Sequence, residues 1–157
     1  MEKEIKAIKS FEVDHDRIVP GIYISRIDED ILTLDLRTRK PNCGDYMDST
    51  TMHTVEHLFA TYIRNSEIGQ KVIYFGPMGC RTGFYLLLRD TEIDEAVKYI
   101  KQVLNEILCH EKEVFGASRR ECGNYLDLDL SAAKKECAQY LKDLEKYGKT
   151  DGKYYEE

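Results

Sequence analysis

The chain contains no tryptophan, only three prolines and no long apolar segment. Its longest uninterrupted apolar run extends from Phe84 to Leu88, far short of the roughly 20 residues that a membrane-spanning helix needs. The first ten residues are rich in charge and lack the apolar core of an export signal. We therefore expect a cytoplasmic protein that does not interact with membranes.

Positively charged residues are also fewer than negatively charged ones. The 23 lysines and arginines are scattered along the chain and outnumbered by 29 aspartates and glutamates, which gives a net charge of −6. No basic stripe is available to bind phosphates, so a nucleic-acid partner is not expected. The 157 residues are 42% hydrophobic, enough for the core of one domain spanning residues 1–157.

Only five cysteines and four histidines are present. An odd number of cysteines without an export signal indicates reduced thiols rather than a disulfide framework. Cys43, in a turn, and Cys109 and Cys137, on predicted helices, receive no functional role.

Hydrophobic periodicity predicts four strands and three helices. Strands are expected at residues 22–27, 31–36, 71–75 and 84–89, the first two joined by an acidic turn at residues 28–30. Helices are expected from about residue 48 to 65, 91 to 108 and 131 to 147, the last ending at Gly148. The order predicts an α+β fold, with a largely antiparallel sheet covered by helices on one face. Residues 149–157 are expected to be a frayed tail.

The most informative stretch is the sequence His53-Thr54-Val55-Glu56-His57. On a helix, His53 and His57 lie on nearly the same face, and Glu56 lies about 60° to the other side of His53. Two imidazoles and a carboxylate at this spacing are typical of a metal site with a proton carrier. The alternative is a helix whose two capping or core histidines hydrogen-bond to Glu56.

A catalytic metal site usually has three protein ligands, so His53 and His57 need a cysteine, a histidine or a carboxylate as a third. Cys122 lies in a glycine-containing turn where a side chain can be aimed freely, although a buried thiol fits its surroundings equally well. Cys80 lies in a turn and precedes Arg81, and a neighbouring cation favours the thiolate. Cys80 is therefore a candidate nucleophile or general base, or else a packed thiol.

Three functions fit these spacings. One is a metallopeptidase of the inverted-zincin type, in which Glu56 would activate a metal-bound water. Another is a metal-assisted enzyme that moves protons beside a carbonyl, with Glu56 and Cys80 as the acid/base pair. The last is a module that only senses or stores a metal, in which Cys80 would be dispensable. The small size of the chain favours the proton-transfer enzyme over the peptidase.

Five motifs, in order, resemble the S-ribosylhomocysteine lyase (LuxS) family of small bacterial metalloenzymes. They are Ser10-Phe11-Glu12-Val13-Asp14-His15, Leu34-Asp35-Leu36-Arg37 followed by Pro41-Asn42, His53-Thr54-Val55-Glu56-His57-Leu58, Pro77-Met78-Gly79-Cys80 and Glu121-Cys122-Gly123. The resemblance covers nearly the whole chain. It implies cleavage of S-ribosylhomocysteine to L-homocysteine and 4,5-dihydroxy-2,3-pentanedione, a quorum-signal precursor, by carbonyl migration and β-elimination.

The resemblance also implies roles for individual residues. His53, His57 and Cys122 correspond to the ligands of one divalent metal per subunit, expected to be Fe²⁺ and replaceable by Zn²⁺ or Co²⁺, with no organic cofactor. Cys80 corresponds to the catalytic cysteine and Glu56 to the second acid/base group. Ser10, His15 and Arg37 correspond to substrate-binding positions. A homodimer with active sites at its interface is expected.

The chain departs from the family pattern in two places. Tyr74-Phe75-Gly76 precedes the Pro-Met-Gly-Cys turn, where family members more usually carry Asp-Ile-Ser near the homocysteine end of the substrate. Thr38-Arg39-Lys40 is also unusually basic. Both differences concern details of the substrate pocket rather than the metal and acid/base residues.

Overall fold

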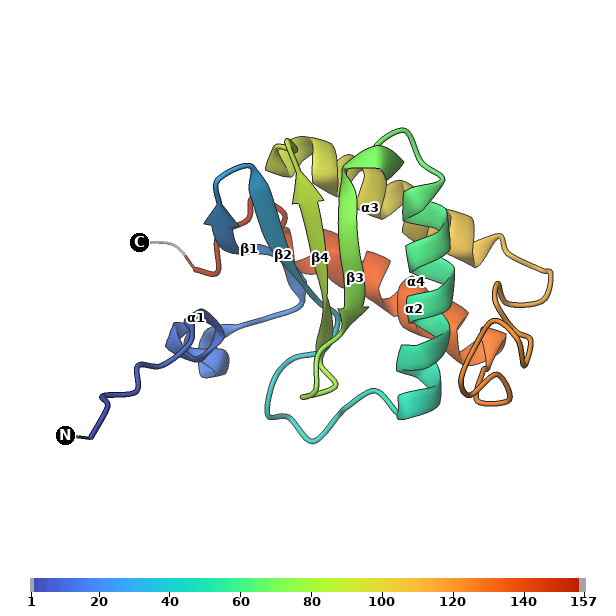
Figure 1. Ribbon diagram of the computed structural model, residues 1–157, viewed down its shortest axis with the longest axis horizontal. Coiled ribbons are helices and arrows are strands. Elements are labelled where there is room, and N and C mark those ends of the chain that lie inside the picture. Colours follow the sequence, from blue (N-terminus) through green and yellow to red (C-terminus); the bar gives the residue numbers. More distant parts are fainter. Residues whose placement is uncertain (1, 156–157) are drawn as a thin grey trace.

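A computed structural model describes residues 2–155 of the chain. Its four strands form one antiparallel sheet in the order β1-β2-β4-β3 (Figure 1). Their bounds are Gly21–Asp28 for β1, Ile31–Arg37 for β2, Val72–Pro77 for β3 and Gly83–Arg89 for β4. The long helices are α2 (Ser49–Arg64), α3 (Ile93–Leu108) and α4 (Leu130–Tyr147). The short helical segments are α1 (Lys9–Glu12), η1 (His15–Arg17) and η2 (Gly69–Lys71).

The three long helices cover one face of the sheet, which confirms the predicted α+β architecture (Figure 1). Each predicted strand is present, with ends that differ by one or two residues. Alternation along β2 directs Leu32, Leu34 and Leu36 into the core beneath the helices. The alternate residues Asp35 and Arg37 therefore belong to the other face of the sheet, yet both are buried.

The helices begin and end where local chemistry favours it. Asp48 caps α2 by accepting a hydrogen bond from the backbone N–H of Thr51, and Asp129 caps α4 in the same way. Gly148 ends α4 in the left-handed conformation, with φ of 63°, as predicted. Among residues 2–155, none of the helices combines the length and apolar character needed to cross a bilayer.

Residues 149–155, which follow α4, are not frayed, contrary to expectation. The backbone N–H groups of Ile22 and Ile24 donate to the carbonyl oxygens of Lys149 and Gly152, and Tyr23 forms a parallel bridge with Gly152. These contacts satisfy the free edge of β1, which would otherwise expose unpaired backbone groups. The prediction of a frayed tail is therefore wrong for residues 149–155, and residues 156–157 lie outside the described chain. We call residues 149–155 the C-terminal strap.

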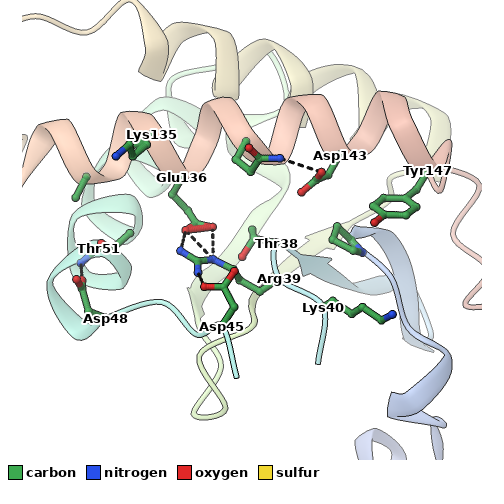
Figure 2. A pocket seen from close by; sticks show the side chains of 13 residues that line it. Thr38, Arg39, Lys40, Asp45, Asp48, Thr51, Lys135, Glu136, Asp143 and Tyr147 are labelled. Atoms are coloured by element: carbon green, nitrogen blue, oxygen red, sulfur yellow. Dashed lines mark hydrogen bonds and ion pairs between the residues drawn. The ribbon is translucent and has the colours of Figure 1, made fainter. Parts of the chain in front are cut away.

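The connection between β2 and α2 is held by a partly buried ion pair. Arg39 donates to both carboxylate oxygens of Glu136 on α4, with contacts of 2.5 to 3.1 Å, and also contacts Asp45 (Figure 2). These side chains line a cavity of about 640 Å³. The basic sequence at residues 38–40 thus has a structural role, because Arg39 fastens the start of this connection to α4.

Candidate metal and acid/base site

His53 and His57 lie one turn apart on α2, and their rings meet edge to face with centroids 4.6 Å apart. Both side chains are partly buried. Each Nδ1 atom faces a backbone carbonyl: that of His53 lies 2.8 Å from the oxygen of Asp127, and that of His57 lies 2.7 Å from the oxygen of Phe115. A carbonyl oxygen can only accept, so Nδ1 must carry the proton in both rings. In the neutral form of such a ring, Nε2 has a lone pair suited to a metal.

Cys122 completes a set of three ligand atoms. Its Sγ lies 3.3 Å from Nε2 of His53, and the ligand atoms of His53, His57 and Cys122 all lie within 4.8 Å of one another. The backbone N–H of Asn124 points at the sulfur from 3.4 Å. Two imidazoles and one thiolate suit Fe²⁺, Co²⁺ or Zn²⁺ and disfavour Mg²⁺ or Ca²⁺. The sequence prediction of these three residues as one cluster agrees with this geometry.

The segment that supplies Cys122 and both carbonyl groups is the long connection between α3 and α4. It is attached to α2 by side chains that the sequence did not single out. The hydroxyl of Thr50 donates a hydrogen bond to the side-chain carboxylate of Asp127. The backbone N–H of Asp129 donates to Oγ1 of Thr54 at 2.9 Å. These contacts hold Asp127 so that its carbonyl group faces His53.

A second attachment involves the buried residue His110. Its Nδ1 accepts a hydrogen bond from the hydroxyl of Tyr62 at 2.7 Å, and its Nε2 contacts the carbonyl oxygen of Glu113 at 3.0 Å. The rings of Tyr62 and His110 both pack against Phe115, whose carbonyl oxygen faces His57. His110 therefore supports the metal site indirectly and is not one of its clustered ligand residues.

Glu56 lies on α2 between the histidines and is partly buried. In the alternative interpretation of this helix, both histidines would bond to Glu56. Their Nδ1 atoms bond to main-chain carbonyls instead, and within residues 2–155 no hydrogen bond links Glu56 to either ring. The carboxylate of Glu56 remains available for proton transfer.

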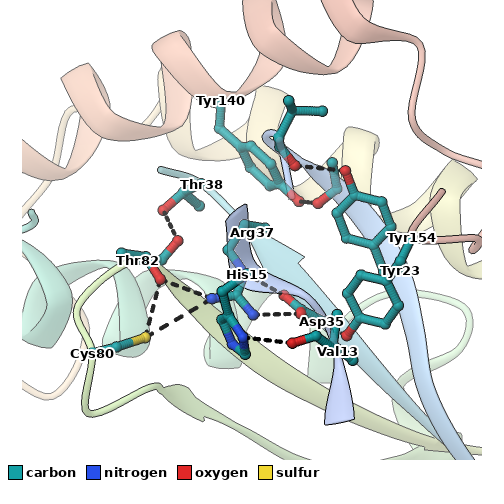
Figure 3. Close-up of polar contacts among 12 residues, drawn as sticks. Val13, His15, Tyr23, Asp35, Arg37, Thr38, Cys80, Thr82, Tyr140 and Tyr154 are labelled. Carbon is teal, nitrogen blue, oxygen red and sulfur yellow. Dashed lines mark hydrogen bonds and ion pairs between the residues drawn. The ribbon is translucent and has the colours of Figure 1, made fainter. Parts of the chain in front are cut away.

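Cys80 lies in the turn between β3 and β4, as predicted. Its Sγ is 3.0 Å from Oγ1 of Thr82 and 3.9 Å from Nη1 of Arg37 (Figure 3). The sequence pointed to Arg81 as the neighbouring cation, but its guanidinium group lies over the ring of Tyr46. Arg37, whose chain position gave no hint of this contact, is the cation that faces the sulfur.

Arg37 is held in a fixed orientation on β2. Its guanidinium group forms a two-point contact with Asp35, with distances of 2.6 and 3.1 Å, and donates to Thr82 at 2.8 Å. Burial acts to lower the pKa of Arg37, but the charge and hydrogen bonds of Asp35 outweigh it and raise that pKa. Arg37 is therefore always a cation, and it presents a fixed positive charge to the Cys80 thiol.

The other two predicted substrate-binding residues lie before β1. Nδ1 of His15 bonds to the carbonyl oxygen of Val13 at 2.8 Å, which turns the ring within the short segment η1. Ser10 lies near Tyr85 on β4, which pairs with Asp35 of β2. Burial, and secondarily the charge of Asp35, raises the pKa of Tyr85. Ser10 thus reaches the same sheet face as the Asp35–Arg37 pair.

Most of the predicted site residues therefore fall into two groups. The metal-ligand group comprises His53, His57 and Cys122. The thiol group comprises the predicted residues Cys80 and Arg37 together with Thr82 and Asp35, which were not predicted as site residues. Within residues 2–155, no hydrogen bond or ion pair joins the two groups.

The unusual Tyr74-Phe75-Gly76 sequence also has a local explanation. A Cβ atom on Gly76 would lie only 2.1 Å from the hydroxyl oxygen of Tyr74. The tyrosine, which is half exposed, can adopt this position on β3 only because residue 76 has no side chain.

Comparison with known proteins agrees with the resemblance seen in the sequence. The family described as S-Ribosylhomocysteinase (LuxS) matches residues 8–151. A protein of Borrelia garinii subsp. bavariensis named S-ribosylhomocysteine lyase is 41% identical over 156 residues, covering 96% of this chain and 99% of the relative. Proteins of the same name from Phocaeicola vulgatus and Finegoldia magna are 41% and 45% identical, covering 96% and 85% of this chain and 98% and 88% of their own lengths.

Both the family match and the full-length similarity exceed what a shared fold alone would produce. The five sequence motifs lie within or overlap the matched segment, and the clustered residues His53, His57 and Cys122 belong to it. The chain therefore belongs to the S-ribosylhomocysteinase (LuxS) family of carbon–sulfur lyases.

Proposed function

We propose that this protein is an S-ribosylhomocysteine lyase that releases L-homocysteine and 4,5-dihydroxy-2,3-pentanedione. The observation that carries this proposal is the clustering of His53, His57 and Cys122 in a chain of the LuxS family. The names of the relatives support the same substrate.

The donor set indicates a single divalent metal as the cofactor. His53 and His57 would bind through Nε2, and Cys122 through Sγ, with their orientation fixed by the carbonyl groups of Asp127 and Phe115. A bound divalent metal would act as a Lewis acid toward oxygens of the sugar. We propose Fe²⁺ as the resident metal, with Zn²⁺ or Co²⁺ able to replace it, because a mixed imidazole and thiolate site accepts all three.

The reaction needs groups that move protons at different atoms. The carbonyl group moves from C1 to C2 and then to C3 of the ribose, and homocysteine leaves from C5 by β-elimination. We assign the proton transfers to the thiolate of Cys80 and the carboxylate of Glu56. Arg37, 3.9 Å from Sγ, and Thr82, 3.0 Å from it, are placed to stabilise a thiolate.

Substrate binding is assigned to Ser10, His15 and Arg37. The separation of the metal-ligand group from the thiol group supports a homodimer in which a site combines groups from both subunits. Light scattering tests this assembly, and a strictly monomeric protein with full activity would contradict it.

The wider role follows from the products. Dihydroxypentanedione is a precursor of a quorum signal in this family, and release of homocysteine would serve the methyl cycle. We place this activity in the cytoplasm, where thiols stay reduced, which is consistent with the five free cysteines.

The deciding experiment measures free thiol released from S-ribosylhomocysteine. Protein purified without oxygen and loaded with Co²⁺ or Fe²⁺ is used at a concentration low enough that its own cysteines contribute little. We expect many turnovers per subunit and none from the Cys80→Ser variant with equal metal content. Absence of release from metal-replete protein would instead favour a peptidase or a metal-storage protein.

A further inference from the structure

The C-terminal strap carries a tyrosine that reaches the thiol group across the open face of the sheet. The hydroxyl of Tyr154 donates to Oδ2 of Asp35 at 2.7 Å, the same oxygen that accepts from Nη2 of Arg37 (Figure 3). Arg37 in turn faces Sγ of Cys80. One continuous set of contacts therefore runs from the strap to the thiol.

Tyr154 is held firmly enough to act as a fixed donor. Its ring stacks on that of Tyr23, with centroids 4.7 Å apart and an angle of 13° between the planes. Tyr23 is fully buried and is itself fixed by donating to the carbonyl oxygen of Val19. Burial, and secondarily the charge of Asp35, raises the pKa of Tyr154, so its hydroxyl keeps its proton and remains a donor.

The strap also fastens the segment that contains His15. The guanidinium group of Arg17 lies over the ring of Tyr155, 3.9 Å from its centroid, and the backbone N–H of Asp14 points at the hydroxyl of Tyr155. Tyr154 and Tyr155 lie beyond residue 151, where the family match ends. Their contacts are therefore not explained by that match.

We propose that Tyr154 is a positioning residue, which fixes Asp35 and through it holds Arg37 beside the Cys80 thiol. The inference rests on the proposed function only in treating Cys80 as a proton-transfer group. Without the Tyr154 hydroxyl, Asp35 loses one of its donors. Its negative charge is then less offset, and the carboxylate that orients Arg37 is held by one contact fewer. Both effects disfavour the Cys80 thiolate.

The test measures how fast Cys80 reacts with iodoacetamide in cobalt-loaded protein, because alkylation requires the thiolate. Trypsin releases residues 72–81 as one peptide in which Cys80 is the only cysteine, so mass spectrometry follows this thiol separately. For Tyr154→Phe, which keeps the aromatic ring, we expect alkylation to slow by about three- to tenfold and kcat to fall with it. Metal content should not change.

Matched variants separate the hydroxyl from the packing of the ring. Tyr155→Phe removes the neighbouring hydroxyl, and in this variant Cys80 should be alkylated at the wild-type rate. Tyr154→Leu removes the ring and the hydroxyl together, and in this variant alkylation of Cys80 should be at least as slow as in Tyr154→Phe. A wild-type rate in Tyr154→Phe with a slow rate in Tyr154→Leu would show that only packing matters and would overturn the proposal.

The position of the strap is checked by digestion with carboxypeptidase. We expect the tail of Tyr154→Phe to be as resistant as that of the wild type. Slow alkylation accompanied by a digestible tail would assign the effect to release of the strap and would also overturn the role of the hydroxyl. Alkylation does not require turnover, so these outcomes remain distinct from a failure of the proposed lyase activity.

Discussion

The Nδ1 atom of His57 lies 2.7 Å from the carbonyl oxygen of Phe115, a residue 58 positions further along the chain. The next residue, Gly116, has a φ of +69°, and a Cβ atom placed on it would lie 3.2 Å from the same Nδ1. The orientation of a proposed metal ligand thus depends on a glycine that is not itself a ligand. Outer contacts of this kind typically change metal affinity by about 10- to 100-fold.

Gly116→Ala should therefore weaken metal binding by about tenfold, because the new methyl group displaces His57 from its carbonyl partner. Competition with a chelator measures the affinity. Gly148→Ala is the matched control, since Gly148 has a φ of +63° but no atom within 4 Å of its Cβ position. Equal metal affinity in the two variants would contradict the role assigned to the Gly116 contact.

Cys122→Ala should lose the metal and the activity together, because two imidazoles alone form an incomplete site. Metal content per subunit, measured on purified protein, provides the readout. Cys109→Ala is the control, since Cys109 is an exposed free thiol that is not in the cluster. Full metal content in Cys122→Ala would refute its assignment as a ligand.

Glu56→Gln should keep its metal but lose at least ~10²-fold in the rate of thiol release, as expected when a general acid/base group is removed. The amide has nearly the same shape as the carboxylate but cannot exchange a proton. Metal content and kcat are measured on the same preparation. A variant that retained near wild-type kcat would exclude Glu56 from proton transfer.

Much of the fold could be predicted from local patterns. The period of apolar residues located the four strands and three long helices, and Gly148 was identified as the end of the last helix from its residue type alone. The spacing of His53 and His57 was informative for the same reason, because a helix fixes which side chains share a face.

The contacts that complete the site could not be predicted in this way. The carbonyl group that orients His53 belongs to Asp127, 74 residues away, and its use depends on backbone direction rather than residue type. The strap was missed because residues 149–155 lack the alternating apolar pattern of a strand, and its pairing with β1 is made by backbone groups. Its side-chain contacts are also distant in sequence: Tyr154 bonds to Asp35, which lies 119 residues earlier in the chain.

Stability should fall at alkaline pH through a buried thiol. Burial, and secondarily the charge of Glu136, raises the pKa of Cys137 from 9.0 to about 12. In the unfolded chain this thiol ionises near its ordinary pKa, so between the two values the unfolded state binds fewer protons. The free energy of unfolding then falls as pH rises, by about 1.4 kcal/mol per pH unit for this group.

Cys137→Ala should remove the contribution of this thiol to the slope of the unfolding free energy against pH. The substitution also lowers stability at neutral pH, because it leaves a small void. Urea unfolding between about pH 8 and about pH 10 measures the slope. The tyrosines of the unfolded chain begin to ionise in this range, but they contribute to the slope equally in the wild type and the variants. Cys109→Ala, which removes an exposed thiol, should keep the wild-type slope. Identical slopes in all three proteins would contradict the effect of burial on Cys137.

Arg39→Ala should destabilise the protein by about 3 kcal/mol, because it leaves the carboxylate of Glu136 buried without its charged partner. The side chain of Glu136 is only 4% exposed, and Arg39 bonds to both of its oxygens. Arg39→Lys should recover only part of this loss, since an ammonium group cannot reproduce the two-point contact.

Arg26→Ala is the control for Arg39→Ala. Arg26 forms a pair of similar geometry with Asp28 at the surface, where both side chains are about half exposed. Water already stabilises these charges, so Arg26→Ala should destabilise the protein far less than Arg39→Ala does. Urea unfolding of both variants at neutral pH gives the two free energies. Equal losses would mean that Glu136 is not effectively desolvated and that Arg39 does not fasten the connection between β2 and α2 to α4. A much larger loss in Arg39→Ala, with a lower kcat, would link this ion pair to the placement of both Arg37 and the start of the helix that carries His53 and His57.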